Sequence, residues 1–212
     1  MEKIISYLIK SVLAGVMIAV GGTVYLSLDN KVVGACLFAI GLFIIVTRGL
    51  NLYTGKVGYI FDEGNGLSYF VEVLVTIAGN FIGTFCFGFL LRFTRIYAPL
   101  QEKAQGMAKA KLGDNLVSIF ILAVFCGILM FLAVNGYKRL GDKLGGYLGV
   151  FLGVIVFILC GFEHSIANMF YFTAAWVWGA KAFLYLFVMI IGNGVGGVLF
   201  PLCGKAIKKL NK

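Results

Sequence analysis

The side chains best suited to chemistry in this chain of 212 residues lie in one short string, GFEHSIANMFYF, at residues 161–172. The string contains the only histidine, His164, directly after Glu163 and four residues before Asn168. Apolar stretches flank it, so we expect these polar groups at membrane depth, where an Asp, Lys or Arg costs roughly 2.5 to 3.5 kcal/mol to insert. Residues kept at that cost usually have a function, here transfer of a proton or hydrogen bond by a side chain with an ordinary pKa of about 6.5. A hydrogen-bonded structural pair is the alternative.

Neither metal binding nor catalysis is expected around His164. One histidine with scattered cysteines lacks the three or four converging ligands of a zinc or iron site. Ser165 is adjacent to the histidine, but adjacent residues rarely present a nucleophile to its base, and the chain has no GxSxG or HExxH motif. The five cysteines are more typical of small buried hydrophobic residues: Cys36, Cys86, Cys126, Cys160 and Cys203. We therefore predict a protein that is not an enzyme and uses no metal or cofactor.

The composition places these residues in a membrane protein. The chain is 61% hydrophobic and 13% charged with a mean hydropathy of +0.99, whereas soluble domains carry roughly 25% charged residues. Apolar runs of about 20 residues are long enough to cross a bilayer as helices. We predict six spans, at about 8–28, 32–52, 67–93, 115–137, 144–171 and 180–203. They nearly exhaust the chain, which predicts a single transmembrane domain over 1–212, with halves of about 1–100 and 101–212.

Two of the predicted spans are interrupted by polar residues. The second span runs into GLNLYTGKVGYIF, where Asn51 and Thr54 break the apolar pattern, and the fifth contains the histidine string. Non-helical backbone at membrane depth is tolerated only where it is buried in protein or lines a cavity. The motif AGNFIG around Asn80 recurs 113 residues later as IGNGVGG around Asn193, and the same separation joins Asn51 to His164. These features predict an all-α inverted repeat with helices 2 and 5 broken and a substrate site where the breaks meet.

The net charge of +9 fits a membrane better than a nucleic acid. The lysines lie in loops and at the ends of the predicted spans, where they would face anionic lipid, and we expect no nucleic-acid partner. We take the N-terminal apolar stretch as the first span and not as a signal peptide. Lysine and arginine are in excess on the side of the two termini, which predicts a multi-pass protein of the inner or plasma membrane with both termini cytoplasmic.

The string GFEHSIANMFYF is similar to the signature of the formate/nitrite transporter family of pentameric anion channels. NLYTG resembles the family's loop in the broken second helix, and the two GN motifs resemble its third and sixth spans. The resemblance implies an aquaporin-like protomer of six helices and a homopentamer with one pore in each protomer. It also implies that His164 is the central pore histidine, that Thr54 hydrogen-bonds near it, and that Asn193 is a nearby partner.

The resemblance assigns further pore residues. Leu52 and Tyr53 match the loop residues of an apolar constriction, and Phe157 matches the facing aromatic residue. The family usually has phenylalanine where Tyr53 stands, so we expect a hydroxyl beside a dry slit. Lys111, 53 residues before the histidine, matches a lysine in the outer vestibule, and Lys109 is the alternative. We expect Lys111 at the head of the fourth span, without a clear acidic partner.

A transport mechanism follows from these assignments. A bare anion in an apolar slit faces a solvation penalty of nominally tens of kcal/mol, which a weak acid avoids by crossing in its protonated form. The vestibule lysine would attract the anion, low dielectric would raise the pKa of the acid, and His164 would supply a hydrogen bond or proton. Formate is the first candidate, with nitrite, hydrosulfide, acetate and lactate also fitting. The alternative is an aquaporin-like channel for small neutral solutes, although neither break contains an NPA motif.

Overall fold

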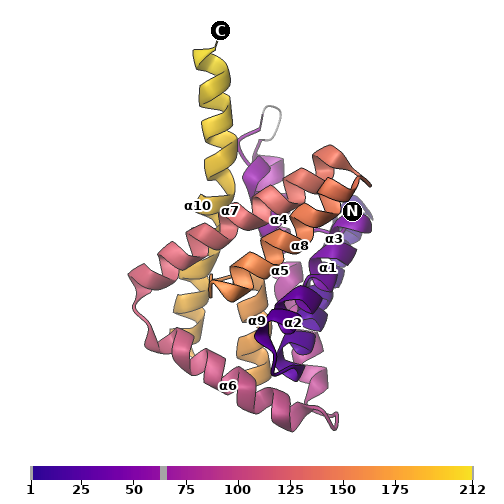
Figure 1. Ribbon diagram of the computed structural model, residues 1–212, viewed down its shortest axis with the longest axis vertical. Helices are drawn as coiled ribbons and strands as arrows, with labels where there is room; N and C mark the ends of the chain where they lie inside the picture. The colour runs from indigo at the N-terminus through magenta and orange to yellow at the C-terminus, as the bar shows by residue number, and fades with distance from the viewer. Residues whose placement is uncertain (1, 63–65, 212) are drawn as a thin grey trace.

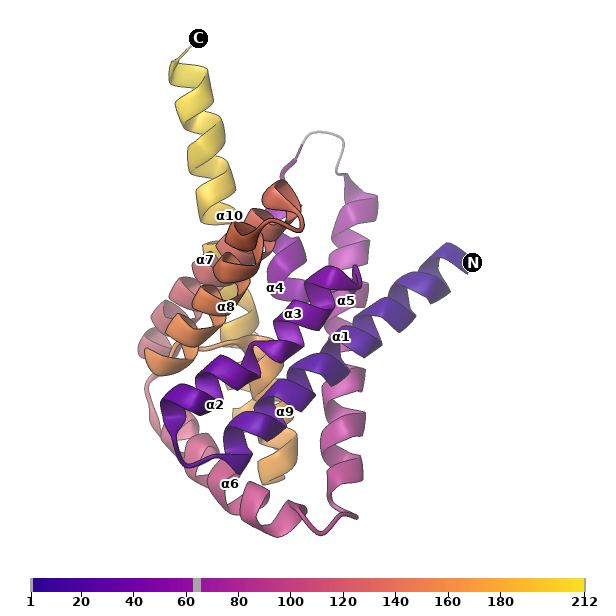
Figure 2. The same ribbon diagram turned by 45° about the vertical axis from the view of Figure 1, so that its right-hand side comes forward.

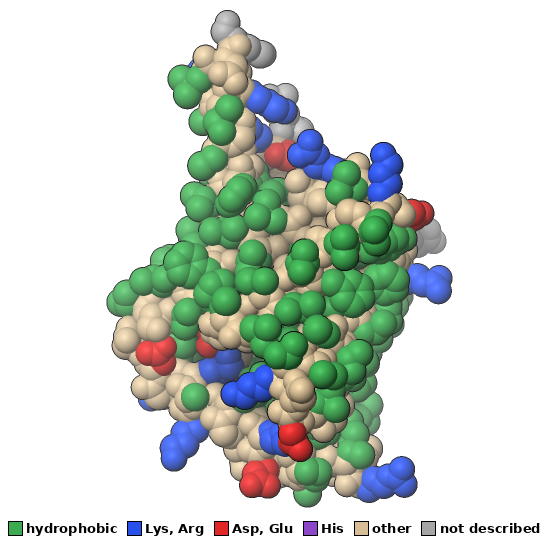
Figure 3. Space-filling model, in the orientation of Figure 1, with side chains coloured by type: hydrophobic (Ala, Val, Ile, Leu, Met, Phe, Trp, Pro, Cys, Tyr) green, Lys and Arg blue, Asp and Glu red, His purple; other side chains and the backbone are tan. Residues whose placement is uncertain are grey.

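The computed structural model describes residues 2–62 and 66–211, and its described elements are helices. Four of them are long and apolar enough to cross a membrane: α1 (Glu2–Ser27), α5 (Leu67–Leu91), α7 (Leu116–Leu140) and α10 (Ala180–Leu210). Figure 1 shows both chain ends in the upper part of the molecule, with the last turns of α10 projecting beyond the rest. Hydrophobic side chains cover the middle of the surface, and charged side chains gather towards its two ends (Figure 3). This distribution suits a bilayer.

The other two predicted spans are divided into shorter helices. The second consists of α2 (Lys31–Phe38) and α3 (Ile40–Thr47), followed after a break by α4 (Tyr53–Lys56) and the 3₁₀ turn η1 (Val57–Tyr59). The fifth consists of α8 (Leu144–Leu159) and α9 (Ser165–Ala175). Helical geometry thus stops after Thr47 and after Leu159 and resumes at Tyr53 and Ser165, while the six spans and the assignment of these segments to two broken spanning helices stay predictions.

The two breaks begin with the same local geometry. Gly49 after α3 has a φ of 60° and Gly161 after α8 has a φ of 69°, a conformation that glycine adopts without strain. In each case the next backbone N–H bonds back over the last turn, from Leu50 to Ile45 at 2.9 Å and from Phe162 to Phe157 at 2.9 Å. This is the Schellman pattern that ends helices at glycine. The sequence thus places both breaks through local backbone chemistry.

The long helices pack in two pairs that repeat one set of contacts. In Figure 2, α1 and α5 lie on one side of the bundle, and α7 and α10 lie on the other. Gly83 of α5 lies against the backbone carbonyl of Val12, and Gly196 of α10 lies against that of Val124. A side chain at either glycine would collide with the facing backbone. Small residues allow such close approach inside a membrane, where helices associate mainly through packing.

Helix α6 (Tyr97–Gly113) was missed by the span prediction and crosses the bottom of the molecule in Figure 1. It is amphipathic: Leu100, Ala104 and Ala108 are buried at a spacing of four residues, and charged residues occupy the exposed side. A search for continuous apolar runs overlooks such a helix. Lys111 belongs to its last turn. The expectation that Lys111 lies at the head of the fourth span was therefore wrong.

An ion pair ties α6 to the loop between α1 and α2. Lys103 donates to the carboxylate of Asp29 at 2.8 Å. This hydrogen bond and the lysine charge hold the pKa of Asp29 below its ordinary value.

Helix α9 lies at the centre, and all its residues are buried. The layers around α9 thus consist of the two helix pairs, with α6 beneath them (Figure 1).

Candidate functional site

The two breaks meet at His164. Its Nε2 lies 3.1 Å from the hydroxyl oxygen of Thr54, and both side chains are buried. The other ring nitrogen, Nδ1, accepts the backbone N–H of Ala167 at 3.1 Å, so the histidine caps the N-terminus of α9. An Nδ1 that accepts cannot carry a hydrogen, so the ring is neutral with its hydrogen on Nε2. His164 therefore donates to Thr54, and the hydroxyl keeps its own hydrogen for another acceptor.

Aromatic rings line one side of His164. Phe157 stacks on the imidazole with ring centroids 5.4 Å apart, and Phe38 packs edge-on against Phe157 at 5.8 Å. Sequence reasoning identified Phe157 but missed Phe38, which comes from α2. The chain has 20 phenylalanines, and Phe38 carries no local signal that separates it from the others. The two rings make an apolar wall beside the histidine.

Asn193 holds the second break in place. Its side-chain oxygen accepts the backbone N–H of Ser165 at 2.8 Å, and its NH₂ group donates to the carbonyls of Glu163 and Ala123, both at 2.8 Å. The Ser165 N–H and the Glu163 carbonyl flank the histidine at the break, whereas the Ala123 carbonyl belongs to α7. Asn193 therefore acts on the backbone around His164, and the three hydrogen bonds of its side chain go to backbone groups.

Asn80 makes the same three bonds at the first break. Its oxygen accepts from the backbone N–H of Tyr53 at 3.0 Å, and its NH₂ group donates to the carbonyls of Asn51 at 2.9 Å and Ser11 at 2.7 Å. The residue between the two bonded backbone positions is Leu52 here. It is His164 in the second break.

The register of the internal repeat consequently differs from the sequence prediction by one residue. Leu52, and not Asn51, takes the place that matches His164. Asn80 lies 29 residues after the carbonyl it binds, and Asn193 lies 30 residues after its own. One extra residue in the second half shifts the alignment between the break and the asparagine motif.

An ion pair lies on the other side of the histidine string. Lys111 donates to the Glu163 carboxylate at 2.6 Å, and the same oxygen accepts from the Asn168 NH₂ group at 2.7 Å. The Lys111 side chain is 15% exposed and that of Glu163 only 4%. The expectation that Lys111 has no acidic partner was wrong. Lys109 is exposed on α6, so the structure brings Lys111 to the string and leaves Lys109 outside it.

Two polar atoms in this region have no partner within residues 2–62 and 66–211. They are the Ser165 hydroxyl oxygen and the Asn168 side-chain oxygen, and both are buried. Most buried polar atoms in proteins are hydrogen-bonded, to water where no protein group is available. Both belong to the first turn of α9, directly after His164. Their hydrogen-bonding capacity is not used by the described part of the chain.

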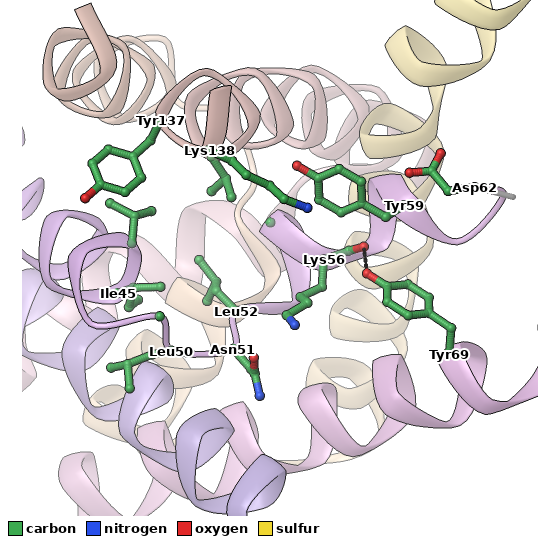
Figure 4. A pocket seen from close by; sticks show the side chains of 14 residues that line it. Ile45, Leu50, Asn51, Leu52, Lys56, Tyr59, Asp62, Tyr69, Tyr137 and Lys138 are labelled. Carbon is green, nitrogen blue, oxygen red and sulfur yellow. Dashed lines mark hydrogen bonds between the residues drawn. The ribbon is translucent and has the colours of Figure 1, made fainter. Parts of the chain in front are cut away.

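Tyr53 and Leu52 are buried in the first break, and the tyrosine hydroxyl has a partner that the sequence did not predict. Its hydroxyl donates to the backbone carbonyl of Ile190 in α10 at 2.8 Å. The hydroxyl is therefore satisfied by the neighbouring helix and bridges α4 to α10. Leu52 lies at the end of a pocket of about 450 Å³ that opens on the side of the chain ends. Figure 4 shows the side chains that line this pocket.

No group of three or more His, Cys, Asp or Glu side chains converges to form a metal site in the described part of the chain. The chemistry available is a neutral imidazole with a hydroxyl partner, a buried ion pair, and apolar rings. Such an arrangement can offer hydrogen bonds to a small polar molecule beside an apolar surface.

Comparison with known proteins identifies this arrangement. The sequence profile of the formate/nitrite transporter family matches residues 1–206. The chain belongs to the formate/nitrite transporter family. This confirms the resemblance inferred from the histidine string, and it makes the chain a multi-pass membrane protein of a family of transporters and channels.

Individual relatives of the formate/nitrite transporter family are distant but similar along most of the chain. A probable formate transporter of Methanothermobacter thermautotrophicus is 29% identical over 235 residues, covering 92% of this chain and 86% of that protein. The formate channel FocB of Escherichia coli (strain K12) is 26% identical over 188 residues, covering 78% of this chain and 65% of FocB. A solved structure of a pentameric formate channel with formate bound matches with a TM-score of 0.84 at 22% identity, over 99% of this chain and 98% of that chain. The predicted all-helical membrane fold is confirmed by this match.

The asparagine bonds yield a stability prediction. Asn193→Leu keeps a similar volume but removes all three hydrogen bonds. Because each buried polar group left unpaired costs about 1 to 3 kcal/mol, we expect a marked loss of thermal stability in detergent, and a comparable loss for Asn80→Leu. Asn211→Leu, at the exposed end of α10, is the matched control. Unfolding temperatures for Asn193→Leu equal to those of the control would contradict the assigned role.

Proposed function

We propose that this protein conducts a small monovalent anion of a weak acid across the membrane, with formate as the first substrate and nitrite or hydrosulfide as alternatives. The observation that carries the proposal is the meeting of Thr54 and His164 between two breaks, beside buried polar atoms without partners. The relatives named for formate transport support the choice of formate. No catalytic step is proposed.

The anion would first meet Lys111. Glu163 already occupies this lysine, so the pair carries no net charge, and the buried carboxylate is stabilised by both Lys111 and Asn168. An incoming anion is attracted to the ammonium group but must share it with Glu163. Weak binding of the anion at this lysine suits a channel, because a site on a conducting path must also release the ion that it binds.

The apolar wall decides in which form the substrate passes. Phe38, Phe157 and Leu52 are each at most 4% exposed. A charged anion between such side chains loses its hydration without compensation, whereas the neutral acid loses far less. The substrate would therefore take up a proton before the wall, as a weak acid can. This requirement selects formic, nitrous and hydrosulfuric acids over anions of strong acids.

His164 would support a hydrogen bond to the substrate, through Thr54, beside the apolar wall. The neutral ring donates from Nε2 to Thr54, which leaves the hydroxyl hydrogen of Thr54 for another acceptor. The passing substrate becomes that acceptor, which replaces part of its lost hydration. The substrate itself carries its proton past the rings and releases it to water where it leaves as an anion. The ring offers its hydrogen bond from the same tautomer, because the Ala167 N–H keeps Nδ1 as an acceptor.

A flux experiment tests the proposal as a whole. Proteoliposomes holding the purified protein should take up formate, and the alternatives nitrite and hydrosulfide, faster than empty vesicles. Water flux measured by light scattering is the control for a neutral-solute channel of the aquaporin kind. Water permeation without anion uptake would replace the proposal with that alternative.

We also propose a homopentamer in the inner or plasma membrane, surrounded by lipid, with both termini cytoplasmic. The pentameric formate channel of the same fold supports this assembly. Mass measurement in mild detergent should give about five times the chain mass of 23.0 kDa. A stable monomer or dimer under those conditions would contradict it.

The role of His164 is tested by two replacements. His164→Phe should remove most formate flux while assembly persists, because the ring shape remains and the donor is lost. His164→Asn keeps a donor that cannot titrate, so it should retain some flux with an altered pH dependence. The measurement is flux per assembled protein between pH 5 and 8. Normal flux and an unchanged pH profile in assembled His164→Phe would exclude a role of the His164 hydrogen bond in transport.

The role of Lys111 is tested against its neighbour on α6. Lys111→Met leaves the Glu163 carboxylate buried without its cation, so it should lower formate uptake, most strongly at low substrate concentration. Lys109→Met removes an exposed charge two residues away and should leave uptake unchanged. The readout is the initial rate against formate concentration. The reverse order of effects would move the vestibule role to Lys109.

A further inference from the structure

The pocket on the side of the chain ends contains two lysines that the proposed mechanism does not use. Lys56 comes from α4 and Lys138 from the last turn of α7. Both side chains extend into the space shown in Figure 4. Within the described residues, no carboxylate forms an ion pair with either ammonium group. This is the opposite of Lys111, whose charge is neutralised by Glu163.

Aromatic rings replace carboxylates as neighbours of these lysines. The Lys138 ammonium lies 4.3 Å from the centre of the Tyr59 ring, and that of Lys56 lies 5.0 Å from the centre of the Tyr7 ring. A cation over an aromatic face is stabilised but keeps its charge. Each ammonium group can therefore still bind an anion.

Nearby acidic groups do not cancel the two charges. Asp62 lines the pocket but pairs with Lys205 at 3.2 Å. Glu72 acts on Lys56 electrostatically, while Lys138 and Lys10 act on it with the opposite sign. The pocket thus has an excess of positive charge.

The rest of the lining is suited to a short carbon chain. The apolar lining of this pocket consists of Ile45, Val46, Leu50, Leu52 and Val134. Tyrosine hydroxyls on the lining are engaged by the protein: Tyr69 donates to the Lys56 carbonyl at 2.8 Å, and Tyr137 donates to Asp142 at 3.3 Å. The volume of about 450 Å³ falls in the range of small-molecule sites, and formate would fill only a small part of it.

We propose that this pocket binds a small dicarboxylate, with one carboxylate on Lys56, the other on Lys138, and the carbon chain against the apolar lining of the pocket. A monocarboxylate neutralises only one of the two ammonium groups. A hydrated inorganic dianion such as sulfate gains nothing from the apolar lining of the pocket. The dicarboxylate satisfies both features at once.

The bound dicarboxylate blocks the route to His164. Leu52 belongs to the pocket wall and is two residues from Thr54, so an occupant lies at the mouth of the slit. It cannot pass as the neutral acid unless both carboxylates are protonated together, and the apolar wall excludes it otherwise. This consequence rests on the proposed function, whereas the binding itself does not.

Calorimetry on the purified full-length protein in detergent tests the binding. Succinate should bind, and propionate and sulfate should bind at least about tenfold more weakly, because each loses one of the two features. Lys56→Met and Lys138→Met should each weaken succinate binding about tenfold or more, as expected for loss of a charge-assisted hydrogen bond. Lys143→Met is the matched control, since Lys143 is exposed near the same end but outside the pocket.

The outcomes separate the site from general charge attraction. Lys56→Arg keeps the charge and should retain binding, and elution as the same assembly on size exclusion shows that each variant is folded. Equal binding of sulfate and succinate, or succinate binding that survives both lysine replacements, would overturn the dicarboxylate site. So would the absence of succinate binding.

Flux in proteoliposomes tests the block separately. Succinate on the side of the pocket should inhibit formate uptake and should not itself be taken up, and Lys138→Met should relieve the inhibition. Succinate that binds without slowing an active formate flux, or that crosses, would overturn the block. Absence of any formate flux would instead count against the proposed function, while calorimetry still decides the site.

Discussion

The need to satisfy backbone groups at membrane depth governs this structure. An α-helix bonds its own N–H and C=O groups, but the two breaks expose several of them where water is scarce. Asn80 and Asn193 each accept one hydrogen bond from the backbone of a break and donate one to it, and each donates a second to a carbonyl of a neighbouring long helix. Without these amides the chain would have to become helical again or open to water. The two breaks can exist because the Asn80 and Asn193 side chains replace hydrogen bonds that a continuous helix would make.

The same constraint fixes the chemistry of His164. Because Asn193 holds the backbone on both sides of it, the histidine stays at the N-cap of α9, where Nδ1 must accept from Ala167. That bond selects the tautomer which donates to Thr54. Helix α9 is buried along its whole length, so the cap cannot tilt without repacking the centre of the bundle. A structural requirement and a functional orientation are thus met by one set of bonds.

The two approaches to the histidine differ in how charge is balanced. On the side of α6, Lys111 is paired with Glu163 in a nearly closed environment. On the side of the chain ends, Lys56 and Lys138 face a pocket of about 450 Å³ and have aromatic neighbours. A paired lysine binds an added anion weakly, and an unpaired one binds it more strongly. Under the proposed function, this difference in charge would give the two sides of the histidine different roles.

The repeat shows how far sequence reasoning reached. The apolar runs, the glycines that end α3 and α8, and the polar strings that follow are local features, because helix length and helix ends depend on neighbouring residues. The GN motifs also indicated two related halves. The separation between the two GN motifs, applied to the breaks, paired His164 with Asn51 when its structural counterpart is Leu52. The error of one residue arises because the chain between the break and the asparagine differs in length in the two halves.

The sequence by itself determined the membrane class, the positions of both breaks and the histidine string, since each depends on composition or on residues close along the chain. The tertiary structure alone decided the partner of Lys111, which is Glu163 at a separation of 52 residues, and the contact of Phe38 with Phe157. It also turned the Tyr53 hydroxyl towards α10 and folded residues 97–113 into a helix. Such pairings depend on how distant helices pack against one another, and packing is a property of the whole chain that no local pattern records.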